Sequence, residues 1–127
     1  MLTHVLSLAI SLLPQAAGKP ELQSGTFLYR TCQATIRGMD GVSRHLSVSD
    51  RIQELADTNY CQGYVDGFTK GMIFGGFPIC FKENPSVGTL VSVYVAYMQK
   101  HPASLDEENY AGLAKALIDA YPCSVTK

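Results

Sequence analysis

The sequence has no excess of charge of either sign. Its 10 lysines and arginines and 11 aspartates and glutamates give a net charge of −1, and the two kinds are interspersed. Binding to nucleic acid needs a clustered basic surface, and binding to an anionic membrane surface needs a polybasic segment. The sequence contains neither of these. We therefore expect no nucleic-acid partner, whereas a compact protein or a small ligand remains open.

The sequence also lacks recognisable catalytic motifs, including G-x-S-x-G, a glycine-rich phosphate loop and H-E-x-x-H. His45 lies in a polar segment and His101 at the end of an apolar one, and neither belongs to a catalytic motif. The acidic run at 106–108 suits a helix N-terminus better than a metal site, and residues 38–41 have too few ligands for a calcium loop. We predict that the protein is not an enzyme and needs no metal or other cofactor.

An uncharged stretch at residues 5–13 is far shorter than the roughly 20 residues of a membrane span. Pro14 and the small residues Ala16 and Gly18 follow it. An apolar core of this length, then a helix breaker and small residues, is typical of a secretory signal. We predict a signal peptide at residues 1–18 and a domain at 19–127. Because the first four residues carry no lysine or arginine, a buried N-terminal helix is the alternative.

All four cysteines lie in the predicted exported part: Cys32, Cys61, Cys80 and Cys123. An even number of cysteines in a small exported chain is typical of a disulfide framework. Zinc sites usually bring their ligands as close pairs, whereas the gaps here are 29, 19 and 43 positions. The sequence therefore favours two disulfides over a metal site.

Apolar residues recur at helical spacing in four segments, at 22–33, 50–75, 87–100 and 104–121. The expected fold is all-α, a small single-domain bundle of about four helices with two disulfides. For the third segment a strand is the alternative, because residues 89–97 are rich in β-prone side chains.

Polar side chains indicate where these helices start. Ser24 or Thr26 is a candidate cap for the first helix, Ser49 or Asp50 for the second and Ser86 for the third. Ser104 followed by Glu107 is a capping-box pattern for the last helix. Residues 34–49 contain several glycines and serines, and we predict that they form a long polar connection.

The second helical segment carries two rows of residues at four-residue intervals. One row is large and apolar (Tyr60, Tyr64, Phe68, Met72) and the other is glycine (Gly63, Gly67, Gly71, Gly75). Each glycine inside a helix costs about 1 kcal/mol relative to alanine, so the row needs a compensating role. We predict close packing of another part of the domain against it. A groove for a second subunit or a partner is the alternative.

Four short motifs carry a family resemblance: C-x-G-Y-x-x-G at 61–67, F-P-I-C at 77–80, H-P at 101–102, and a closing A-L…Y-P-C at 116–123. In this order and spacing, after a signal peptide, they resemble the Rap/Tai-type immunity proteins of type VI secretion systems, over residues 25–123. The resemblance implies a small, helical, periplasmic protein that protects a cell from peptidoglycan-cleaving amidase effectors.

As such a protein it would act by occlusion, as a rigid body or a homodimer that places a loop in the effector's catalytic cleft. The candidate partner-binding residues lie in two exposed segments, one around residues 37–45 and one after Cys80. They are Arg37, Met39, Arg44, His45, Lys82, Glu83 and Asn84. A periplasmic chaperone or an accessory protein on the same scaffold is the alternative function.

Four cysteines allow three pairings. Cys32 near the end of the first helix and Cys61 in the second can meet if those helices pack antiparallel. Cys80 and Cys123 then tie the tail to the middle of the chain. We therefore prefer Cys32–Cys61 with Cys80–Cys123.

Overall fold

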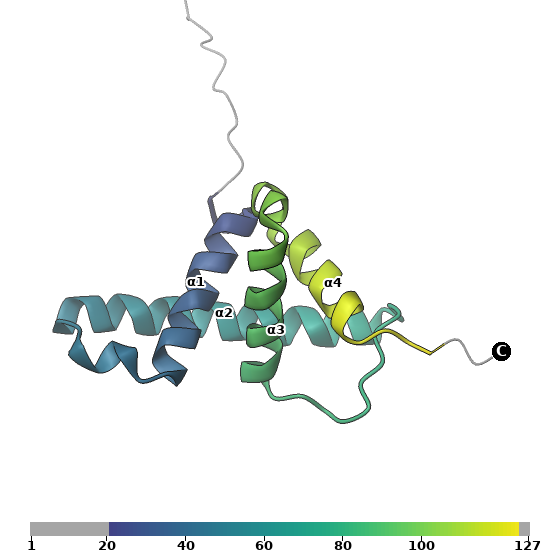
Figure 1. Ribbon diagram of the computed structural model, residues 1–127, viewed down its shortest axis with the longest axis horizontal. Coiled ribbons are helices and arrows are strands. Elements are labelled where there is room, and N and C mark those ends of the chain that lie inside the picture. The colour runs from purple at the N-terminus through teal and green to yellow at the C-terminus, as the bar shows by residue number, and fades with distance from the viewer. Residues whose placement is uncertain (1–20, 125–127) are drawn as a thin grey trace, which may run out of the picture.

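Four α-helices make up most of the computed structural model, which describes residues 21–124 (Figure 1). They are α1 (Gly25–Met39), α2 (Val48–Phe74), α3 (Val87–Lys100) and α4 (Asn109–Ala120). Three short 3-10 helices lie between or before them: η1 (Glu21–Gln23), η2 (Val42–His45) and η3 (Pro102–Asp106). No strand occurs in this part of the chain, so the predicted all-α fold is confirmed and the strand alternative for α3 is wrong. The predicted signal peptide lies outside the described residues.

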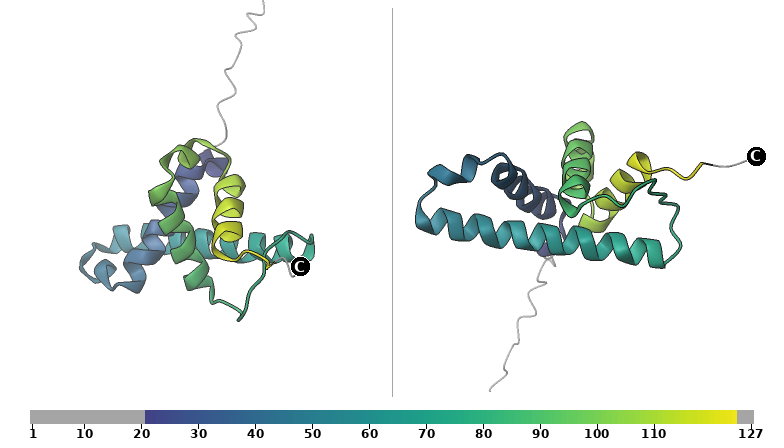
Figure 2. Two further views of the ribbon diagram at one scale, coloured as in Figure 1. Left: turned by 45° about the vertical axis from the view of Figure 1, so that its right-hand side comes forward. Right: turned by 90° about the horizontal axis from the view of Figure 1, so that it is seen from below.

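The long helix α2 forms one side of the molecule. The right-hand view of Figure 2 shows α1, α3 and α4 all packed on one side of α2. Between positions 21 and 124, no helix has both the length and the hydropathy of a membrane span.

Helix α1 is longer than predicted and continues through Ile36 to Met39. The predicted end at Gln33 was wrong because Ala34 and Thr35 are buried, at 0% and 1% exposure, and packing holds the extra turn in place. The long connection predicted for 34–49 therefore shrinks to residues 40–47. In it, Gly41 adopts a left-handed conformation, with φ of 73°.

Two predicted helix caps are also corrected. Helix α2 starts at Val48, two residues earlier than expected, and its cap is Ser47, whose Oγ accepts from the Asp50 N–H (3.2 Å). The capping box proposed at Ser104 and Glu107 does not form: Ser104 is buried within η3, and α4 starts only at Asn109. The predicted caps Ser24 and Ser86 are confirmed.

The start of α1 explains why η3 replaces the expected first turn of α4. The Gly25 N–H donates to the Glu107 carbonyl oxygen (2.9 Å), and the Thr26 hydroxyl donates to that of Leu105 (3.1 Å). These carbonyls satisfy donors at the N-terminus of α1, which a helix cannot satisfy internally. Residues 102–107 are thus shaped by a tertiary contact.

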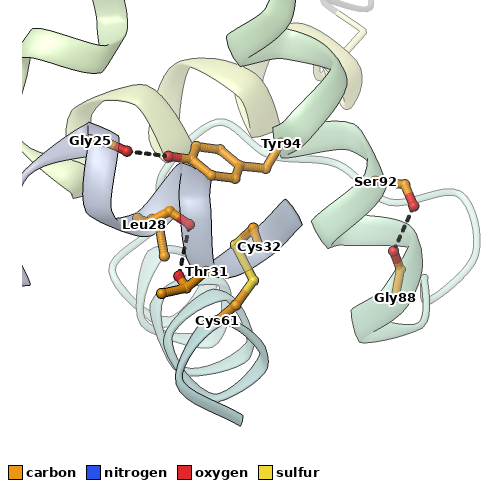
Figure 3. Close-up of a disulfide and its surroundings, with 8 residues drawn as sticks. All are labelled: Gly25, Leu28, Thr31, Cys32, Cys61, Gly88, Ser92 and Tyr94. Carbon is orange, nitrogen blue, oxygen red and sulfur yellow. Dashed lines mark hydrogen bonds between the residues drawn. A yellow bond between two sulfur atoms is a disulfide. The ribbon is translucent and has the colours of Figure 1, made fainter. Parts of the chain in front are cut away.

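The core lies where α1, α3 and α4 meet the inner face of α2. Its largest fully buried side chain is Tyr94 of α3, whose hydroxyl donates to the Gly25 carbonyl oxygen (3.4 Å; Figure 3). Burial raises the pKa of Tyr94, so the phenol stays neutral. Apolar residues from all four helices surround it: Leu28, Val65, Val91, Met98, Leu113 and Leu117.

Both predicted disulfides are confirmed. Cys32–Cys61 joins α1 to α2 inside the core, where both residues are fully buried (Figure 3). Cys80–Cys123 joins the segment after α2 to the segment after α4. The first bond therefore links two helices of the core, and the second links two non-helical segments at its edge.

The glycine row of α2 does not face the domain. A Cβ built at Gly63, Gly67 or Gly71 meets nothing within 4 Å, while Cys61 and Val65 occupy the buried face. The predicted packing of this row within the domain was wrong, because the residues that α2 buries in the core are Cys61, Val65, Thr69 and Met72. The alternative of a groove for another chain stays open.

Gly25 differs from that row, and its replacement by alanine is expected to destabilise the protein. A Cβ at this position would lie 2.6 Å from the Ser104 carbonyl oxygen, so the backbone of α1 or η3 must shift. Overpacking of this kind costs about 1–3 kcal/mol. Equilibrium urea unfolding of Gly25→Ala measures the loss. Gly71→Ala is the control. Its free energy of unfolding should rise by up to about 1 kcal/mol, because a Cβ at this position meets no other atom within 4 Å. A lower free energy of unfolding in both variants would contradict this account.

Candidate partner-binding surfaces

The first candidate surface is the corner between α1 and α2, defined here as residues 37–45 with the first turns of α2. A cavity of about 480 Å³ lies at this corner, lined among others by Gly38 and Ser43 on one side and Ile52 and Leu55 on the other. The Ile52 and Leu55 side chains are more than half exposed. The corner thus presents an apolar hollow to solvent.

The polar groups of the corner are held by Glu54, whose side chain is only 11% exposed. Its Oε1 atom accepts from the Arg37 Nε–H (3.2 Å) and from the Ser43 hydroxyl (2.6 Å). Arg37 therefore has a structural partner within the chain. Arg44 and His45 lie in η2, and both are exposed.

Met39 ends α1 and is 58% exposed, and its thioether lies beside the first turn of α3, close to Gly88. Of the four residues predicted to form a partner-binding loop here, Arg37 and Met39 belong to a helix. The interpretation of 37–45 as a free loop was wrong in this respect.

The second candidate surface is the α2–α3 loop, residues 75–86. Figure 1 shows it leaving the end of α2 and running below the helices to α3. Four contacts fix its middle. Cys80 is bonded to Cys123, and its N–H donates to the Tyr121 carbonyl oxygen (2.9 Å). Ile79 forms a bridge with Pro122, and the rings of Phe81 and Tyr121 meet edge to face at 4.6 Å.

Directly after these anchors come Lys82, Glu83 and Asn84, all exposed. They line a cavity of about 870 Å³ together with Tyr121 and Ser124 of the tail. Within residues 21–124 their side chains make no hydrogen bond or ion pair. The structure thus brings the three predicted residues together, with polar groups available to another molecule.

A third polar cluster was missed in the sequence and lies where η1, α2 and α4 meet. The Tyr64 hydroxyl donates to Asn109 Oδ1 (2.8 Å), and Asn109 Nδ2 and the Tyr60 hydroxyl both donate to the Leu22 carbonyl oxygen (3.0 Å each). Burial is the main reason that the pKa of Tyr64 rises to about 12, which keeps its proton in place as a donor. Asn109 is 5% exposed, so the cluster is a fixed structural joint.

The two described histidines lie apart from any such cluster. His101 follows α3, its ring stacks on Tyr97 at 4.0 Å, and its Nδ1 lies 2.9 Å from the Tyr97 carbonyl oxygen. No group of three or more His, Cys, Asp or Glu residues in the described part of the chain is placed to hold a metal ion. The candidate sites described above are exposed side chains at the corner between α1 and α2 and in the α2–α3 loop.

A comparison with known protein families found a match. The model of a family described as Rap1a immunity proteins matches residues 24–123. Searches of the curated proteins and of the solved structures found no match. The matched range runs from the cap of α1 to the second cysteine of the Cys80–Cys123 disulfide, and so covers all four helices.

Proposed function

The chain belongs to the Rap1a immunity protein family, and on this basis we propose that it neutralises a peptidoglycan amidase effector of a type VI secretion system. Family membership supports an immunity protein that binds a secreted effector. It favours this function over a chaperone or accessory role on the same scaffold. The amidase as target, and occlusion as mechanism, are our proposal.

The α2–α3 loop is the part that we propose enters the effector's catalytic cleft. The observation that supports this is the contrast between its anchored base and its unpaired tip. Lys82, Glu83 and Asn84 make no bond within the described chain, so binding need not break one. Because the Cys80–Cys123 bond fixes the base, little conformational entropy is lost when the tip is held. A preorganised tip of this kind can block a cleft without any chemistry of its own.

The proposed compartment is the periplasm, reached through the signal peptide predicted at residues 1–18. Two disulfides and no free cysteine among the described residues support an oxidising environment. The periplasm is also where a peptidoglycan amidase would meet its substrate. We further propose that the protein acts as a homodimer.

The test is protection of cells that express an amidase effector in the periplasm. The wild-type protein should restore growth, and the triple variant Lys82→Ala, Glu83→Ala, Asn84→Ala should not. Loss of two or three charged or polar contacts at a desolvated interface costs about 3 kcal/mol, which is a rise in Kd of about 100-fold. Isothermal titration calorimetry with the purified effector gives the Kd.

Arg44→Ala with His45→Ala is the matched control, because both residues are exposed at the other candidate surface. We expect this variant to protect as the wild type does. If the control loses protection and the triple variant keeps it, the effector binds at the corner between α1 and α2 instead. Absence of protection by the wild type would refute the assignment to that effector.

A further inference from the structure

The two disulfides differ in how far solvent reaches them. The core disulfide, Cys32–Cys61, joins two residues that are 0% exposed between α1 and α2 (Figure 3). In the edge disulfide, Cys80–Cys123, the first residue is exposed and the second is half-buried. Cys80 also lines the cavity of about 870 Å³ beside the α2–α3 loop. Reduction of a disulfide starts when a thiolate reaches one of its sulfur atoms, so access decides which bond reacts first.

The helices need not move when the edge disulfide opens. Cys80 follows the end of α2 and Cys123 follows the end of α4, and both lie in non-helical segments. Opening the core disulfide instead requires α1 to separate from α2, which exposes the core. Local opening at the edge of a domain needs much less free energy than opening of its core. The global stability of the fold therefore protects the core disulfide, whereas only local contacts protect the edge disulfide.

Those local contacts lie close to the two cysteines. The Cys80 N–H donates to the Tyr121 carbonyl oxygen (2.9 Å), and Ile79 lies opposite Pro122 in a bridge. The rings of Phe81 and Tyr121 meet edge to face at 4.6 Å. A single hydrogen bond and a single aromatic pair each add little net stability. Without the cross-link, they hold the α2–α3 loop to the tail only loosely.

We infer that Cys80–Cys123 is a site of reversible thiol–disulfide exchange, which switches the α2–α3 loop between an anchored form and a released form. A dithiol reductant supplies the two electrons and two protons. One of its thiolates attacks a sulfur of the bond, forms a mixed disulfide and expels the other cysteine as a thiolate. The second thiol of the reductant then displaces the remaining cysteine. Both cysteines end as thiols, and the reductant leaves as its own disulfide.

Opening of the edge disulfide alters the region that we propose binds the effector, so this consequence rests on the proposed function. In the oxidised form Lys82, Glu83 and Asn84 directly follow the anchored Cys80. In the reduced form these residues are ordered only on binding, and the conformational entropy lost at that step lowers the affinity. We expect the selectively reduced protein to bind the effector about 100-fold more weakly.

Graded reduction of the full oxidised chain tests the exchange site without any effector. Dithiothreitol is added, samples are quenched with iodoacetamide at intervals, and peptide mass spectrometry gives the labelled fraction of each cysteine. Cys80 and Cys123 should be labelled together, at least about ten times faster than Cys32 and Cys61, while the far-ultraviolet circular dichroism stays unchanged. In guanidinium, which unfolds the chain, both bonds should react at similar rates. Equal rates in the folded protein, or earlier labelling of Cys32 and Cys61, would overturn the inference.

Two variants distinguish local opening from unfolding. Phe81→Ala removes the ring contact with Tyr121, so it should speed reduction of the edge disulfide more than that of the core disulfide. Gly25→Ala destabilises the core, so it should speed reduction of the core disulfide about tenfold and leave the edge disulfide nearly unchanged. If Gly25→Ala speeds the reduction of both bonds equally, the edge disulfide opens only through unfolding and the inference is wrong.

Hydrogen–deuterium exchange of the selectively reduced protein tests the release of the loop. The Cys80 amide, which donates to Tyr121 in the oxidised form, should exchange at least about tenfold faster, while the amides of the four helices stay protected. Calorimetry with the effector gives the Kd of both forms, and oxidised glutathione should restore the oxidised values. Unchanged exchange at residues 75–86, or an unchanged Kd, would overturn the switch. An oxidised protein that does not bind the effector would refute the proposed function instead, and the order of labelling would still decide the exchange site.

Discussion

Replacing Cys32 and Cys61 together by alanine is expected to lower the free energy of unfolding by about 5 kcal/mol. The disulfide closes a loop with a sequence separation of 29, and the loss of that constraint in the unfolded chain accounts for about 4 kcal/mol. Because both residues are fully buried, the missing sulfur atoms also leave a cavity, which adds about 1 kcal/mol. Guanidinium unfolding at equilibrium, followed by circular dichroism, measures the change.

A loss of this size is comparable to the whole stability of a small domain, so this variant should be partly unfolded at 37 °C. A double mutation to valine serves as the control for volume, since it fills most of the space but restores no cross-link. We expect the valine variant to regain about 1 kcal/mol at most. Full recovery by valine would show that packing, and not the cross-link, is what the cysteines provide.

Replacing Cys80 and Cys123 together by serine is expected to weaken effector binding about 100-fold while the four helices stay folded. This bond lies at the edge of the domain and holds the base of the α2–α3 loop. Without it, two or three loop residues must be ordered at the moment of binding. Fixing the backbone of each residue costs about 1–2 kcal/mol of conformational entropy. The sum is about 3 kcal/mol, which is roughly 100-fold in Kd.

The expected loss of stability for the serine variant is about 2–4 kcal/mol, so binding must be measured under conditions where it remains folded. Calorimetry with the effector gives the Kd, and far-ultraviolet circular dichroism verifies the helices. The informative comparison is with Gly25→Ala, which destabilises the core but leaves the loop anchored. If that variant loses as much affinity as the serine variant, the effect comes from stability and the role proposed for the loop is wrong.

Together these experiments assign different roles to the two disulfides. One stabilises the contact between α1 and α2, where Leu28 and Val65 are also buried. The other fixes a surface loop that carries Lys82, Glu83 and Asn84. Under the proposed function, a periplasmic protein that presents one loop to its effector benefits from both.

The helical character of the chain and its cysteine framework could be predicted from local sequence patterns. Apolar residues at helical spacing predicted α2 and α3 nearly to their ends, because that period depends on local geometry. The spacing of Cys32, Cys61, Cys80 and Cys123 indicated disulfides, and the motifs around them resembled the family that matches the chain.

Which faces of those helices lie inside became clear only from the way the helices pack. A helical period shows that Gly63 and Gly67 share a face, and that Tyr60 and Tyr64 share another, but not which of the two a neighbour covers. That depends on where α1, α3 and α4 pack, and they pack opposite the glycines. The same long-range contacts lengthened α1 and turned residues 102–106 into η3, since backbone groups far apart in sequence satisfy each other there.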